Sequence, residues 1–230
     1  MRGRGERMDG GVVAARLRRV RPRLAVAAGL GPVVGLALTP VFRGWWWGGV
    51  PLLCAVLGAV YFRGRRFRPR RWPSAGAVLG VLGGAYVTSL SPWLFPSTVL
   101  FGLTGWAVAK RARDSVLEPY TPELADSPVE VPWQARGARN LELLVAHDRI
   151  GVVGRFRGAM VALSGVGAVE QVMVAKRATV GVGELKVTVT PGPAVRISVP
   201  LGEWIVPTDH GREIARLVAR RKERNASLGA

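Results

Sequence analysis

The chain has 230 residues, 49% of them hydrophobic, and a formal net charge of +18. Residues 24–109 hold seven arginines and no acidic residue, whereas residues 114–230 hold fifteen basic and thirteen acidic residues. A nucleic-acid-binding domain carries its basic residues on the folded domain itself, but here they flank apolar segments. The composition therefore argues against a DNA-binding protein and indicates an integral membrane protein.

The first 23 residues form a predicted basic arm with eight arginines and two acidic residues. A signal peptide would have a short apolar core and a small-residue cleavage site, but the apolar run that follows is too long, and further apolar runs come after it. We therefore expect residues 1–23 to be a cytoplasmic arm. A membrane-associated DNA-binding role for the arm is an alternative, although retention on the cytoplasmic face already accounts for its arginines.

Residues 24–110 predict an α-helical membrane bundle of about four transmembrane helices, at about 24–42, 45–62, 74–90 and 96–110. The first run has nineteen residues without a charge. Residues 74–109 contain no charge either and are too long for one simple span. Turn-forming residues at Ser91, Pro92 and Trp93 favour two short helices here over one span with a re-entrant segment.

The basic residues predict the orientation of these helices. From the N-terminus, the segments outside the predicted spans hold eight, one, six, none and three basic residues. Since basic segments stay on the cytoplasmic side, the alternation favours an even number of spans in the inner (plasma) membrane, with both termini cytoplasmic. The predicted cytoplasmic cluster comprises Arg63, Arg65, Arg66, Arg68, Arg70, Arg71, Lys110, Arg111 and Arg113.

Tryptophans lie near the predicted ends of the helices. Tryptophan prefers the headgroup region, so we interpret Trp45, Trp46, Trp47, Trp72 and Trp93 as membrane-interface anchors. Residues 24–109 contain no Asp, Glu, Lys or His. Ion-coupled transporters usually need such a group inside the membrane, which makes a channel- or transporter-like component an alternative rather than the leading expectation.

Glycines repeat at a spacing of four residues in two of the predicted helices. Gly76, Gly80 and Gly84 lie on one helix face, and Gly31 and Gly35 repeat the spacing in the first helix. Small residues at this spacing allow two helix backbones to approach closely. The sequence leaves open whether the partner helix belongs to the same chain or to a second copy.

Residues 111–135 form a predicted acidic, proline-rich linker. Five acidic residues and four prolines lie between positions 114 and 132, with no basic residue among them. Prolines stiffen a segment and remove backbone donors, so we expect an extended spacer. Its negative charge suggests that it holds the following domain away from an anionic membrane surface.

Residues 136–225 predict a small, mostly β domain. Short β-branched runs at 141–146, 150–156, 159–163, 169–174, 185–190, 194–199 and 204–206 indicate six or seven antiparallel strands. Thr208 or Asp209 then provides an N-cap for an amphipathic helix, in which Ile214, Leu217 and Val218 form the apolar stripe.

The order of strands closed by a C-terminal helix resembles bacterial pleckstrin-homology-like domains over about residues 138–222. The segments that carry the resemblance are LELLVAHDRIGVVGRF, VALSGVGAVEQV and DHGREIARLVARR. Many members have a tryptophan ahead of the third strand region, where this chain has Leu163, Ser164 and Gly165. The resemblance implies a cytoplasmic binding or scaffolding domain that follows transmembrane helices, and it assigns no lipid-binding residue.

No catalytic arrangement stands out in the sequence. His147 lies beside Asp148 in a predicted turn, His210 lies in the first turn of the final helix, and Cys54 is the only cysteine. We expect no catalytic residue, metal site or cofactor. The expected function is a non-enzymatic membrane protein that presents a cytoplasmic binding or scaffold domain. Its expected partners are the lipid bilayer and either a protein or a second copy; no small-molecule substrate is identified and nucleic acid is not expected.

Overall fold

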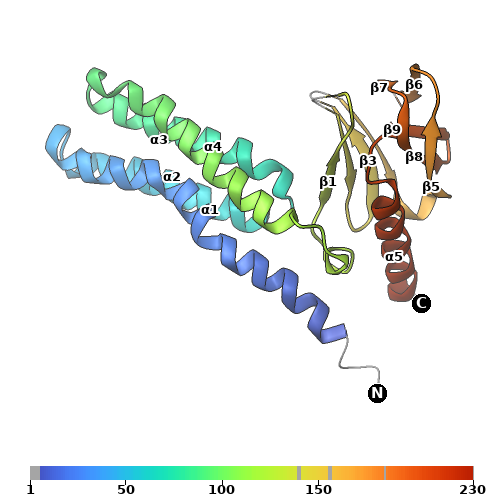
Figure 1. Cartoon of the computed structure of the whole chain (residues 1–230). Helices are drawn as coiled ribbons and strands as arrows, with labels where there is room; N and C mark the ends of the chain where they lie inside the picture. Colours follow the sequence, from blue (N-terminus) through green and yellow to red (C-terminus); the bar gives the residue numbers. More distant parts are fainter. Residues whose placement is uncertain (1–5, 139–140, 155–156, 184, 230) are drawn as a thin grey trace. The chain divides into compact units, whose positions relative to one another are not determined.

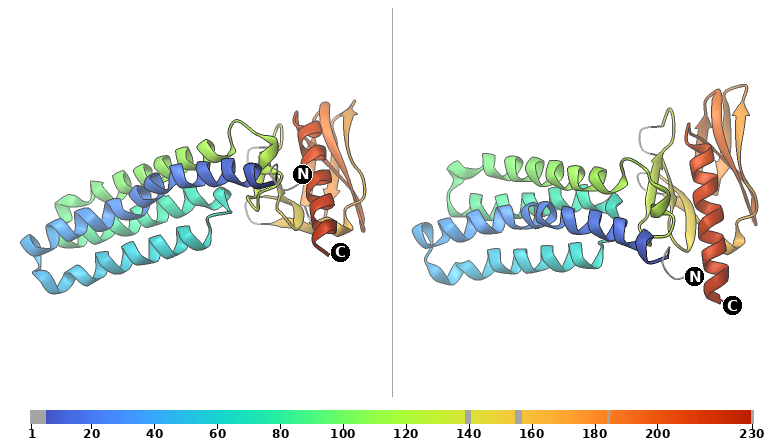
Figure 2. Two further views of the ribbon diagram at one scale, coloured as in Figure 1. Left: turned by 90° about the horizontal axis from the view of Figure 1, so that it is seen from below. Right: turned by 60° about the horizontal axis from the view of Figure 1, so that its bottom comes forward.

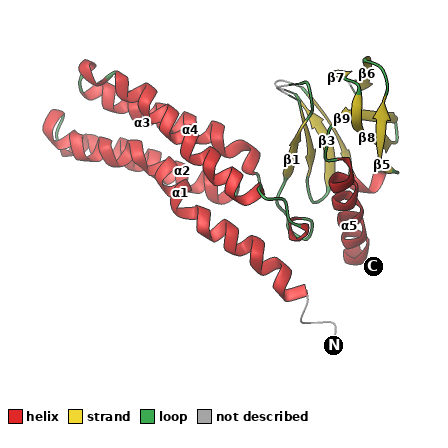
Figure 3. Cartoon of the chain, viewed as in Figure 1, coloured by secondary structure: helices red, strands yellow, loops and turns green. Residues whose placement is uncertain are grey.

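The computed structural model describes residues 6–138, 141–154, 157–183 and 185–229. The chain divides into two compact units, Met1–Tyr120 and Thr121–Ala230. The first unit is helical and the second is mostly strand (Figures 1 and 3). This division confirms the predicted helical half and the predicted β half.

The helical unit contains four helices connected by short segments. They are α1 (Glu6–Phe42), α2 (Gly49–Gly64), α3 (Trp72–Leu90) and α4 (Pro96–Leu117), with single 3₁₀ turns at Trp45–Gly48, Pro69–Arg71 and Pro92–Leu94. Figure 2 shows the four helices lying side by side. The chain breaks between α3 and α4 at Ser91, which has extended backbone angles ahead of Pro92, as the turn residues predicted.

Three helical segments among the described residues are long and apolar enough to cross a membrane: Gly11–Phe42, Trp46–Gly64 and Pro69–Leu90. The fourth helix, α4, is not among them. A membrane span needs about 20 residues, and any stretch of α4 that long includes Lys110, Arg111 and Arg113. These charges lower the mean hydropathy of α4 below that of the three candidate spans.

Residues 1–23 were predicted to be a separate arm, but α1 begins at Glu6 and continues without a break into the apolar segment. From position 6 onward, the arginine-rich start of the chain is therefore part of α1. Val13, Val20 and Leu24 are buried, and they lie at helical spacing among the arginines. The Arg16 guanidinium donates to the carbonyl oxygen of Val116 at 3.3 Å, and Arg23 donates to the Ser115 hydroxyl at 2.6 Å. These contacts join the basic part of α1 to the end of α4.

Glycines bring α3 and α4 into backbone contact. A Cβ atom on Gly80 would overlap the carbonyl oxygen of Phe101, and Cβ atoms on Gly76 and Gly84 would likewise overlap the α4 backbone. In α1, a Cβ on Gly31 would lie 2.7 Å from the Cα of Gly83, and Gly35 faces the ring of Tyr86. All five glycines of the predicted packing faces therefore meet neighbours within the same chain.

A small hydrogen-bonded cluster joins three segments at the end of the helical unit where α1 ends. The Thr39 side chain is buried; its hydroxyl donates to the Gly35 carbonyl at 2.6 Å and lies 2.7 Å from the Tyr86 hydroxyl. Tyr86 in turn donates to the carbonyl oxygen of Trp47 at 3.0 Å. One phenol hydroxyl therefore links α1, the tryptophan turn and α3.

We expect Tyr86→Phe to lower the free energy of unfolding of the helical unit by about 1 kcal/mol, because a bridging hydroxyl is lost while the ring is kept. The measurement is denaturant-induced unfolding of the full-length protein in detergent. Tyr61→Phe is the matched control, since the Tyr61 ring packs edge-on against Phe62. Equal shifts for the two variants would show that the cluster contributes nothing.

The second unit contains nine strands in the described residues and a closing helix. The strands form three antiparallel sheets, with orders β1-β2-β3-β4, β5-β8-β9 and β6-β7. Their bounds are β1 Val131–Gln134, β2 Glu142–Val145, β3 Arg149–Val153, β4 Gly158–Ala162, β5 Val169–Val174, β6 Ala178–Val182, β7 Leu185–Val189, β8 Gly192–Val199, β9 Gly202–Pro207, followed by α5 Gly211–Gly229.

The antiparallel strands and the C-terminal helix were predicted, but two of the strands were not. β1 contains Pro132 and lies in the segment predicted to be a linker, and β6 lies between the predicted strands at 169–174 and 185–190. The backbone of Gly183, just after β6, has a positive φ of 58°. Gly183 therefore forms the turn that ends β6.

The acidic, proline-rich segment does not form an extended spacer over its whole length. Leu124, Ala125 and Val129 are almost completely buried, and the second unit begins at Thr121. The Asp126 carboxylate accepts two hydrogen bonds from Arg220 of α5, at 2.8 and 2.5 Å. The prediction considered only charge and proline content, whereas the apolar residues between the prolines provide buried surface and one acidic residue pairs with α5.

Candidate functional site

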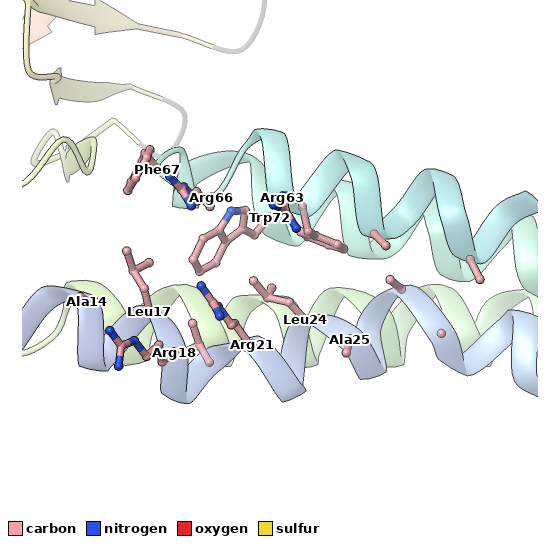
Figure 4. Close-up of a pocket in the computed structure, with 16 residues that line it drawn as sticks. Ala14, Leu17, Arg18, Arg21, Leu24, Ala25, Arg63, Arg66, Phe67 and Trp72 are labelled. Atoms are coloured by element: carbon pink, nitrogen blue, oxygen red, sulfur yellow. The ribbon is translucent and has the colours of Figure 1, made fainter.

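The main candidate site is a groove of about 820 Å³ between α1 and α2, with Trp72 of α3 in its wall (Figure 4). Its wall is made of side chains from three stretches of the helical unit. These are Ala14, Leu17, Arg18, Val20, Arg21, Leu24, Ala25, Ala28, Gly29, Ala55, Ala59, Phe62, Arg63, Arg66, Phe67 and Trp72.

The groove exists because the facing residues of α1 and α2 are small. Ala25 and Ala28 on α1 face Ala55 and Ala59 on α2 across it. The helices approach closely where Gly58 meets Ala28, where an added Cβ would lie 3.0 Å from the Ala28 Cβ. Methyl side chains cannot fill the space on either side of that contact, so an apolar channel remains open.

Four arginines lie at one end of this apolar channel. Arg18 and Arg21 belong to α1, while Arg63 and Arg66 belong to the end of α2 and the segment after it, and all four are exposed. Figure 4 shows Arg21 rising from α1 toward Trp72, with Arg66 on the opposite wall. The Arg66 guanidinium lies 4.5 Å from the centre of the Phe67 ring.

The charge of these arginines is not balanced within the helical unit. Residues 10–113 contain no Asp or Glu. Within the part of the chain that the structure describes, Arg18, Arg21, Arg63 and Arg66 have no carboxylate partner. Four like charges around a low-dielectric wall concentrate a positive potential at the mouth of the groove, which attracts anions.

Trp72 is a packing residue and not a surface anchor, which corrects the prediction. Its side chain is fully buried, and its indole N–H donates to the carbonyl oxygen of Arg65 at 3.1 Å. The reason is that Trp72 begins α3 inside the basic loop, where the loop backbone supplies an acceptor. Trp46 and Trp93, by contrast, are 97% and 91% exposed, and Trp47 is about half exposed. The side chain of Trp45 lies outside the described residues.

The remaining predicted basic residues gather at the same end of the helical unit as the groove. Lys110 lies over the Trp106 ring at 5.1 Å, and Arg111 is exposed on α4. The Arg23–Ser115 hydrogen bond places the basic part of α1 beside this part of α4. The basic positions not yet placed, Arg65, Arg68, Arg70, Arg71 and Arg113, lie in the loop after α2 and at the end of α4.

The histidines of the second unit form exposed surface pairs. His147 lies 3.4 Å from Asp148, and His210 lies 2.9 Å from Glu213. The Arg149 side chain donates to both oxygens of Asp148 at 3.0 Å, and this hydrogen bonding lowers the pKa of Asp148 below its ordinary value. In the described part of the chain, no three His, Cys, Asp or Glu side chains lie together as a metal site would require.

The residue that the sequence reasoning missed is Arg221 of α5, whose side chain is 1% exposed. Its guanidinium donates to the carbonyl oxygens of Val129 at 2.7 Å, Val145 at 2.8 Å and Leu124 at 3.1 Å. Two longer bonds reach the carbonyls of Ala125 and Ser127. We call this arrangement the Arg221 cradle; it fixes the acidic segment and β2 to α5.

A signal for this burial was present in the sequence. Arg221 lies three, four and seven residues after Val218, Leu217 and Ile214, so it shares their helix face. The predicted apolar stripe named only Ile214, Leu217 and Val218, because a charged side chain is usually exposed. Position on the helix was the better guide, since arginine is buried when its five N–H donors find acceptors.

Comparison of the chain with protein-family models, with curated proteins and with solved structures found no match in any of the three.

Proposed function

We propose that this chain is a multi-pass protein of the inner (plasma) membrane with four spans and both termini in the cytoplasm, and that it presents its β unit there as a non-enzymatic binding or scaffold domain. The surface of the helical unit supports membrane insertion. Aliphatic side chains on its helices are more than half exposed, including Val33, Leu53, Leu57 and Leu103. Exposed apolar side chains on several helices are expected where the surroundings are apolar.

The observation that carries the proposal is the separation of residue types between the two ends of the helical unit. Basic residues of α1, of the loop after α2 and of the end of α4 share one end. Exposed Trp46 and Trp93 lie in the turns at the other end, where the described residues include a single basic residue, Arg43. A basic cytoplasmic end and an aromatic opposite end are the expected pattern for a membrane bundle.

The fourth span is proposed for α4. At 22 residues, α4 is about 33 Å long, of which the charge-free part, residues 96–109, accounts for about 21 Å. Its backbone contact with α3 along three glycines ties it to a helix that is apolar enough to span. The Lys110 ammonium group lies over the exposed Trp106 ring, 5.1 Å from its centre, so the first charge of α4 has an aromatic partner.

We assign the binding role to the β unit, and we propose that this unit is a pleckstrin-homology-like domain. Antiparallel sheets closed by a C-terminal helix support that resemblance. Met160 on β4 and Met173 on β5 are 47% and 74% exposed, and both strands lie at a sheet edge. Methionine on an accessible surface and an unpaired strand edge both suit contact with another protein.

The topology is tested with single cysteines in a Cys54→Ala background. Cysteines at positions 46, 93, 111 and 201 are suitable because these side chains are exposed, and Leu201 is fully so. We expect a membrane-impermeant maleimide to label positions 46 and 93 in intact spheroplasts, and positions 111 and 201 only after permeabilisation. Labelling of position 201 in intact spheroplasts would place the β unit outside the cytoplasm and would overturn the proposal.

A further inference from the structure

We propose that the groove between α1 and α2 holds one anionic phospholipid, with its phosphate at Arg18, Arg21, Arg63 and Arg66 and an acyl chain along the alanine-lined walls. This inference rests on the proposed membrane insertion and adds to it a specific ligand site. It is carried by the charge of the mouth, the chemistry of the walls and the size of the cavity.

The mouth of the groove is suited to an anion from outside the helical unit. Four guanidinium groups border the groove, and no carboxylate occurs between positions 10 and 113. A guanidinium group binds phosphate through two parallel N–H donors, and pairs from facing helices can hold one phosphate from both sides. Basic pockets between helices on the cytoplasmic side of a membrane bind phospholipid headgroups on this principle.

The walls select a ligand with an apolar tail. Beyond the arginines, α1 contributes Leu24, Ala25 and Ala28, and α2 contributes Ala55 and Ala59, with no polar side chain among the lining residues there. A soluble phosphate would occupy only the mouth and leave this channel unfilled. A phospholipid fills both parts at once, because its polar and apolar ends match the two ends of the groove.

The cavity has the size and rigidity of a single binding site. Its volume of about 820 Å³ lies within the usual range for one small ligand. Trp72 is fully buried in the wall and hydrogen-bonded to the backbone of Arg65, so it holds this part of the wall in place. The mouth is formed by exposed arginines that can reorient around a headgroup.

The test measures lipid binding by the full-length protein with native mass spectrometry. The probes are phosphatidylglycerol and phosphatidylcholine with the same acyl chains, and glycerol phosphate as the soluble headgroup. We expect phosphatidylglycerol to bind at least tenfold more tightly than phosphatidylcholine. Each arginine that contacts an anionic headgroup should raise the affinity about fivefold, and at least two arginines should do so. We expect glycerol phosphate not to displace it.

Two variants with matched controls locate the site. Arg21→Gln with Arg66→Gln removes one charge from each side of the mouth and is expected to weaken phosphatidylglycerol binding about 30-fold. The control, Arg19→Gln with Arg111→Gln, removes two exposed arginines of the same basic end that do not line the groove. Ala25→Phe fills the channel and should also abolish the preference, whereas Ala85→Phe on α3 should not.

Several outcomes would overturn the lipid site. These are equal binding of the two lipids, equal losses in the mouth variant and its control, or displacement by glycerol phosphate, which would indicate a soluble phosphate ligand. Carbonate extraction of membranes separates this failure from that of the proposed function. A protein that stays in the membrane but shows no lipid preference contradicts only the lipid site, whereas a protein released by carbonate contradicts the membrane insertion.

Discussion

Gly80→Leu is expected to lower the free energy of unfolding of the helical unit by more than about 3 kcal/mol, at the upper end of the cost of overpacking. A Cβ at this position would overlap the carbonyl oxygen of Phe101 and lie 2.5 Å from its carbonyl carbon. Both are backbone atoms, so no change of rotamer can make room. Helices α3 and α4 must therefore separate, and this separation also breaks the backbone contacts at Gly76 and Gly84.

The measurement is denaturant unfolding of the full-length protein in detergent, for a graded series at two glycines. Gly80→Ala should cost about 2 kcal/mol, because even one methyl group meets backbone. Gly29→Ala is the control: this glycine is inside α1 and nothing lies within 4 Å of its added Cβ. Alanine there should be neutral or stabilising by up to about 1 kcal/mol. Similar values for Gly80→Ala and Gly29→Ala would show that close approach of α3 and α4 is not required.

Arg221→Met should lower the free energy of unfolding of the β unit by about 3 kcal/mol or more. Methionine has a similar length but no donors, so the carbonyls of Val129 and Val145 would lose their bonds to the guanidinium. A buried carbonyl without a donor costs about 1–3 kcal/mol. The acidic segment should separate from α5 first, because it has no sheet of its own from Thr121 to Glu130.

Hydrogen exchange of the full-length protein measures this effect segment by segment. We expect faster exchange at 124–129 and in β2 for Arg221→Met, and a smaller change for Arg221→Lys, which keeps the charge but lacks the planar fork of donors. Arg216→Met on the exposed face of α5 is the control and should change the free energy by less than about 0.5 kcal/mol. Protection at 124–129 that survives in Arg221→Met would show that the cradle is dispensable.

The helical unit uses small residues in two ways. Along α3 and α4 the small residues are glycines, and the two backbones touch. Between α1 and α2 they are mostly alanines, whose methyl groups keep the backbones apart without filling the space. A one-carbon difference therefore decides between a closed seam and a groove, because a Cβ prevents backbone contact but is too short to fill a helix–helix gap.

The sequence by itself determined the apolar helices, the break at Ser91 and Pro92, the change to antiparallel strands and the closing helix. These features depend on short-range patterns: the length of an apolar run, a turn residue, and the spacing of β-branched or apolar positions. The glycine spacing belongs to the same class, since positions four apart share one helix face whatever the partner helix is.

Only the tertiary structure decided the roles of Arg221, Trp72, the acidic segment and the groove. The acceptors of Arg221 lie 76 to 97 positions away in the sequence, and a charged side chain is buried only when such distant carbonyls converge on it. Trp72 looked like a surface tryptophan until the loop backbone of Arg65 supplied its acceptor. The groove is a gap between two helices, and whether alanines meet partners or empty space depends on how the helices are placed.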